Sequence, residues 1–137
     1  MGTVTVVDPV QGLRLLGARR FYSFGRYAEN VVDSITTTEL AALLKKNPDS
    51  VVLLDVREED ERAAASITPS LHIPMNSVPD RLDELPRDRR LVVYCHHGSR
   101  SYAVAGYLEA EGFMEVTNLT GGIDDWARLV DTSVPRY

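Results

Sequence analysis

Hydrophobic residues gather in short runs that alternate with helical patterns along most of the chain. Residues 51–54 and 91–94 are continuously apolar, as expected of strands that are covered on both faces. Residues 116–119 predict a further strand, and Leu71-His72-Ile73 predicts a short one before a proline. These segments together predict several short strands of a buried sheet.

Helices are predicted between these strands. Thr36-Thr37-Thr38-Glu39 matches a capping box, in which Glu39 reaches back to the residue that caps the helix. Leu40, Leu43 and Leu44 then fall on one helical face, and Asn47-Pro48 ends the run. Residues 58–65, 101–111 and 122–130 predict further helices, with Gly112 capping the second of these, and residues 76–85 predict a loop with a pair of helical turns.

The alternation of strands and helices predicts the α/β class, with a parallel sheet and helices on both faces. In such sheets, functional sites lie at the carboxyl ends of the strands. Asp55 and Cys95 both directly follow a predicted strand. We therefore expect these two residues to lie at the same edge of the sheet.

Composition narrows the functional classes. The chain has 137 residues, of which 44% are hydrophobic and 26% are charged, as in ordinary globular domains. A net charge of −5 argues against a nucleic-acid partner. We expect no membrane segment, because no apolar run approaches the ~20 residues that a membrane helix needs. The single cysteine excludes an internal disulfide, and we expect a cytoplasmic protein.

Residues 1–30 are treated as an N-terminal extension to a domain over residues 31–137. The extension is basic and aromatic, and Val4 to Val7 has the β-branched content of a strand. An extra strand or edge element is the favoured interpretation. A targeting peptide and a docking arm for a partner are the alternative interpretations of this segment.

Cys95 holds the most informative position for chemistry. It ends the apolar run 91–94, and a polar loop, His96 to Arg100, then leads into a helix. Backbone N–H groups in such a loop and at the helix start form an anion cradle that stabilises a thiolate. The alternative is a buried cysteine that only fills the core. Two histidines and an arginine directly after it favour a reactive thiol.

Three motifs in order resemble the rhodanese family of sulfurtransferases, over about residues 35–126. They are Asp55-Val56-Arg57, the loop Cys95 to Arg100, and the segment from Leu119 to Trp126 that contains Gly121-Gly122. The chain departs from the family pattern at residues 66–70, where Pro69 cannot adopt the positive φ of a glycine. The resemblance implies a rhodanese-like fold with a central parallel sheet of about five strands.

The candidate site follows from the cradle and from the resemblance. We expect Cys95 to be the catalytic nucleophile. The resemblance implies that Asp55 and Arg57 support the loop, with Arg57 tying down neighbouring backbone or meeting the donor. A surface ion pair with the acids of residues 58–61 is the alternative for Arg57.

Arg100 is expected to supply a fixed positive charge, and an ordinary helix-surface arginine is its alternative. The predicted substrate-binding residues are His96, His97, Gly98, Ser99, Arg100 and Ser101. Gly121-Gly122 and Trp126 are assigned to structure, as a tight turn and a core anchor.

The expected reaction moves sulfur from a small anionic donor, such as thiosulfate or a persulfide, to cyanide or a thiol through a Cys95 persulfide. We expect no cofactor and no metal. Cys95, His96 and His97 are adjacent, whereas metal ligands are normally spaced by two or more residues. His72 is interpreted as a structural histidine. A protein could also donate or accept the sulfur, which would make the chain a carrier or interaction module. A phosphatase or arsenate reductase is the remaining alternative, although its loop places five residues between cysteine and arginine and this chain has four, His96 to Ser99.

Overall fold

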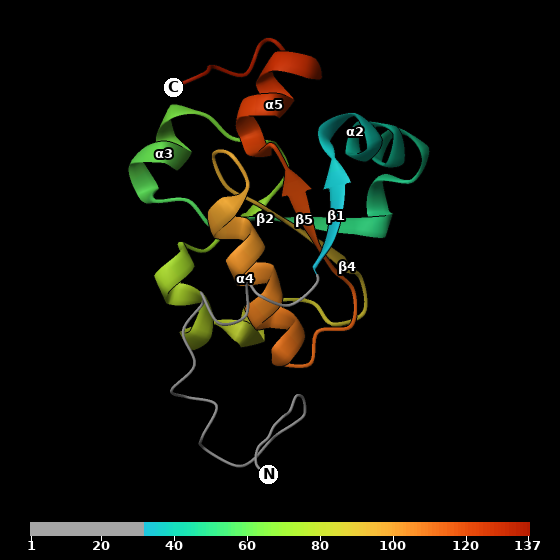
Figure 1. Ribbon diagram of the computed structural model, residues 1–137, viewed down its shortest axis with the longest axis vertical. Helices are drawn as coiled ribbons and strands as arrows, with labels where there is room; N and C mark the ends of the chain where they lie inside the picture. Colours follow the sequence, from blue (N-terminus) through green and yellow to red (C-terminus); the bar gives the residue numbers. More distant parts are fainter. Residues whose placement is uncertain (1–31) are drawn as a thin grey trace.

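The computed structural model describes residues 32–137 and builds them around a five-stranded sheet (Figure 1). All strand pairings are parallel, and the spatial order is β1-β5-β4-β2-β3. This arrangement confirms the predicted α/β class. The strands are β1 (Asp33–Thr36), β2 (Val51–Asp55), β3 (Leu71–His72), β4 (Arg90–Tyr94) and β5 (Val116–Thr120).

Helices lie between the strands, close to the predicted positions. The capping box at Thr36 and Glu39 is confirmed, with both reciprocal hydrogen bonds present. Gly112 follows the end of α4 with a positive φ, which agrees with its predicted capping role. The helices are α2 (Thr37–Lys46), α3 (Glu59–Ala64), α4 (Ser99–Ala110) and α5 (Gly122–Leu129), and the 3-10 turns are η2 (Pro48–Ser50), η3 (Met75–Asp80) and η4 (Leu82–Glu84).

Two local features differ from the expectations, and the first is strand β1, because no strand was predicted over residues 33–36. Helix α4 begins at Ser99, two residues before the predicted start, because Gly98 takes a left-handed conformation (φ 116°) and turns the chain into the helix early. The departure at residues 66–70 contains a cis peptide bond between Thr68 and Pro69.

The core lies on both faces of the sheet, because neighbouring strand residues point to opposite sides. Leu54 and Val93 pack in one cluster with Leu108 of α4. Leu53 and Tyr94 pack in the other. That second cluster also contains Leu40 of α2 and Ile123 and Trp126 of α5, so the predicted core anchor is confirmed. Helices therefore cover both faces, and the loops at the carboxyl edge stay available for a site.

The described residues include no helix that is long and apolar enough to cross a membrane. The prediction for residues 1–30 lies outside the part of the chain that the structure describes.

Candidate active site

The Cys95 sulfur sits directly after β4 and is contacted by the start of α4. The N–H groups of Gly98 and Ser101 donate to Sγ over 3.2 and 3.3 Å. The Ser101 hydroxyl lies 3.3 Å from the same atom. Cys95 is only 1% exposed. The expected main-chain donors are therefore present, and they face a sulfur that is largely shielded from water.

Glycines let the loop backbone approach its neighbours closely. Gly122 has φ 59°, and a side chain there would collide with the carbonyl oxygens of Cys95 and His96. Those same oxygens accept hydrogen bonds from the N–H groups of Ile123 (3.0 Å) and Asp124 (3.1 Å). The first turn of α5 therefore fixes the Cys95 loop. From the sequence, Gly121-Gly122 had indicated only a tight turn.

Ser101 is oriented from the neighbouring strand. Its hydroxyl donates to Oδ1 of Asn118 on β5 over 2.6 Å. Both residues are buried, and buried polar groups need such partners. Asn118 was not a predicted site residue, although an asparagine inside a buried strand is the kind of signal that could have found it.

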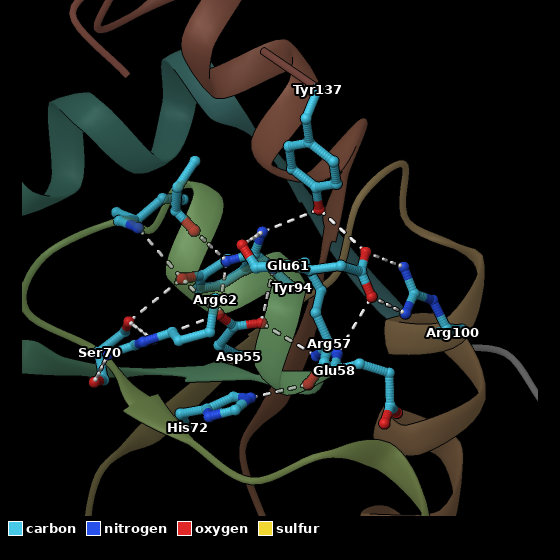
Figure 2. A network of polar contacts seen from close by, with 12 residues as sticks. Asp55, Arg57, Glu58, Glu61, Arg62, Ser70, His72, Tyr94, Arg100 and Tyr137 are labelled. Atoms are coloured by element: carbon cyan, nitrogen blue, oxygen red, sulfur yellow. Dashed lines mark hydrogen bonds and ion pairs between the residues drawn. The ribbon is translucent and has the colours of Figure 1, made fainter. Parts of the chain in front are cut away.

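Asp55 and Arg57 form a fully buried ion pair, here called the buried pair (Figure 2). Arg57 donates through Nε to Oδ1 (2.9 Å) and through its terminal nitrogen to Oδ2 (2.7 Å). It also donates to the carbonyl oxygens of Glu61 and Ala65. Arg57 thus ties down the backbone around α3, and the structure does not show the surface ion pair that was its alternative.

Further donors surround the Asp55 carboxylate. Arg62 and the Tyr94 hydroxyl each donate to Oδ2 over 3.2 Å. Burial acts to raise the pKa of Asp55, but the hydrogen bonds and charge of Arg57 outweigh it, so that the pKa is lowered. Burial and then the Asp55 charge raise the pKa of Tyr94. Asp55 is therefore an anion whose oxygens are fully engaged within the fold.

Arg100 and Glu61 form a second ion pair, here called the surface pair. The two terminal nitrogens of Arg100 donate to the two Glu61 oxygens over 2.8 and 2.9 Å. The hydrogen bonds from Arg100 lower the pKa of Glu61 to about 2. Arg100 is therefore neither a free charge nor an isolated surface arginine. Glu61 was missed because nothing in the acidic run 58–61 distinguishes it from its neighbours.

Tyr137, at the end of the described chain, points its hydroxyl toward Glu61 and Arg57 (Figure 2). Its ring stacks on His96 with centroids 4.1 Å apart, and its hydroxyl accepts from Arg57 and donates to Glu61. Burial raises the pKa of Tyr137 to about 12. No feature of the sequence pointed to this residue.

The two loop histidines stack on each other with centroids 4.0 Å apart. Burial and then the His97 charge lower the pKa of His96, so its ring is neutral near neutral pH. Its Nε2 atom is buried without a hydrogen-bond partner. His97 and Ser99 are exposed. His72 lies away from this stack, with Nε2 2.8 Å from the Arg57 carbonyl oxygen, as expected of a structural histidine.

Comparisons with known proteins agree with this geometry. The family model described as "Rhodanese-like domain" matches residues 36–129. A sulfurtransferase of Allochromatium vinosum is 41% identical over 98 residues, covering 72% of this chain and 91% of the relative. The thiosulfate sulfurtransferase GlpE of Coxiella burnetii is 34% identical over 72% of this chain and 91% of its own. A rhodanese-like domain protein of Staphylococcus aureus has a similar solved structure, with a TM-score of 0.67, 32% identity, and coverage of 77% of this chain and 99% of that one.

Proposed function

Since the chain belongs to the rhodanese family, we propose that it transfers sulfane sulfur from a small donor, such as thiosulfate or a persulfide, to cyanide or a thiol. The observation that supports this most is the pair of N–H donors aimed at the buried Cys95 sulfur. Such donors stabilise an anion on that atom, either the thiolate or the terminal sulfur of a persulfide.

The reaction consists of two displacements. The Cys95 thiolate attacks the outer sulfur of the donor, and the sulfur–sulfur bond of the donor breaks with its electron pair leaving on sulfite or on a thiolate. The acceptor then attacks the outer sulfur of the Cys95 persulfide, and the electron pair of that bond returns to Sγ. Cys95 is the single cysteine of the chain, so no internal thiol competes for the sulfur.

Residues around the loop have distinct proposed roles. Gly98 and Ser101 supply the anion-binding N–H groups, and Asn118 orients the Ser101 hydroxyl. The buried pair holds the backbone beside the loop. The proposed location is the cytoplasm, where a lone thiol stays reduced.

Two-substrate kinetics test the proposal. Double-reciprocal plots for donor and cyanide should be parallel, as a covalent intermediate requires, and Cys95→Ser should have no turnover. Hydrolysis of an aryl phosphate without any sulfur transfer would instead favour the phosphatase alternative. Rapid transfer from a protein persulfide, with negligible turnover of small donors, would favour a carrier.

A further inference from the structure

The arginine of the Cys95 loop is already paired with a carboxylate. Arg100 and Glu61 meet in a bidentate contact, the geometry that makes such pairs strong. Hydrogen bonds to Glu61 are the largest cause of the raised pKa of Arg100, and the nearby Cys95 charge is a smaller one. Arg100 directly precedes Ser101, whose N–H donates to the Cys95 sulfur, and the charge of the Arg100 guanidinium is balanced by Glu61.

Glu61 is held in this position from several sides (Figure 2). Its Oε1 atom accepts from the Tyr137 hydroxyl over 3.0 Å, and its Oε2 atom accepts from the Glu58 N–H over 3.1 Å. Together with the two contacts from Arg100, four hydrogen bonds fix the carboxylate. An incoming anion would have to displace a preorganised partner in order to use the Arg100 charge.

Other arginines that approach the loop are also paired. Arg57 is engaged by Asp55. Arg136 donates to both oxygens of Asp124, whose own N–H holds the His96 carbonyl. In the part of the chain that the structure describes, each of these arginines therefore faces a carboxylate. Arg100 and Arg136 each have a carboxylate partner of their own, so their charges are balanced before a donor approaches.

Charge differs strongly between the two classes of donor. Thiosulfate is a dianion, so its encounter with a thiolate gathers three negative charges and releases the dianion sulfite. A hydropersulfide, RSSH, carries at most one negative charge on its sulfur atoms and releases a singly charged thiolate. Repulsion between charges a few ångströms apart is substantial where water is partly excluded. The reaction with thiosulfate therefore depends more strongly on an unpaired cation beside the sulfur.

We propose that Glu61 is a specificity-determining residue, which disfavours dianionic donors by neutralising Arg100 and so selects hydropersulfides over thiosulfate. The inference rests on the proposed function and names its donor class. In the preferred reaction the Cys95 thiolate bonds to the outer sulfur of RSSH. The inner sulfur leaves with the electron pair as RS⁻, and the proton stays on the transferred sulfur or passes to water.

Glu61→Gln tests this role, since the amide keeps the size of the side chain and removes its charge. Values of kcat/KM should be measured for thiosulfate and for cysteine hydropersulfide, with cyanide as acceptor. We expect the thiosulfate value to rise about tenfold, which corresponds to one well-placed charge. The hydropersulfide value should stay within about twofold. Glu59→Gln is the matched control, because it removes an equal charge from an exposed position of α3 and should change neither value.

Ionic strength gives a second readout on the same two proteins. Wild-type kcat/KM for thiosulfate should not fall as salt is added, whereas the value for Glu61→Gln should fall, because salt screens an attraction only where one exists. An equal loss of activity towards both donors in Glu61→Gln would overturn the proposal and make Glu61 only a support for Arg100. A wild-type preference for thiosulfate would overturn it too. Absence of turnover with either donor in every protein would instead refute the sulfurtransferase function.

Discussion

The buried pair and the surface pair use the same chemical groups in different surroundings. The side chains of Asp55 and Arg57 are both 0% exposed. Those of Glu61 and Arg100 are 18% and 34% exposed. Both pairs have bidentate hydrogen bonds of similar length. Contact geometry alone therefore does not say what either pair contributes.

Access to water and to substrate separates their roles. The buried pair is shielded from solvent, and two further hydrogen bonds from Arg57 go to the backbone around α3. Its contribution is to the fold beside the loop. The surface pair borders the loop and can be reached by solutes, so its net charge affects which donors approach. The buried pair therefore supports the fold, whereas the surface pair influences which donors can react.

Breaking each pair from its arginine side is the strongest test of this difference. Arg57→Met removes the fully buried partner of Asp55 and leaves its carboxylate with only the longer contacts from Arg62 and Tyr94, so we expect a loss of about 3–5 kcal/mol in the free energy of unfolding. Arg100→Met is the matched control, with an expected loss of about 1 kcal/mol or less, because water can solvate Glu61. Urea unfolding of both variants measures these values. Equal losses would contradict the distinction between the two pairs.

Acid should weaken the surface pair in a defined window. The pKa of Glu61 in the folded chain is about 2, below its ordinary value of 4.5, because of the hydrogen bonds from Arg100. A lowered folded pKa means that the unfolded chain binds more protons, so this contribution to stability is complete above the ordinary value and is lost as the pH falls towards the folded one.

Urea unfolding of wild type and Glu61→Gln measures that contribution. The difference in unfolding free energy between the two proteins should shrink as the pH falls from about 6 to about 3, because only wild type has a carboxylate to protonate at this position. A difference that stays constant over this range would show that the Glu61 charge does not stabilise the fold.

Local sequence patterns predicted strands β2 to β5, the capping box and the loop at Cys95, because each depends on neighbours in the chain, whereas β1 was not predicted. The start of α4 was missed by two residues, since the left-handed turn at Gly98 brings Ser99 into the helix. Glu61 and Tyr137 could not be found in this way. Glu61 meets Arg100 39 residues along the chain, and Tyr137 meets Glu61 across 76. Only the folded chain brings these groups together.

Mass spectrometry of the Cys95 peptide tests the central claim most directly. After exposure to thiosulfate or to cysteine hydropersulfide, wild type should gain the mass of one sulfur atom on this peptide and lose it again when cyanide is added. Cys95→Ser should gain none. Equal labelling of the serine variant, or no labelling of wild type by either donor, would contradict the assignment of Cys95 as the sulfur carrier.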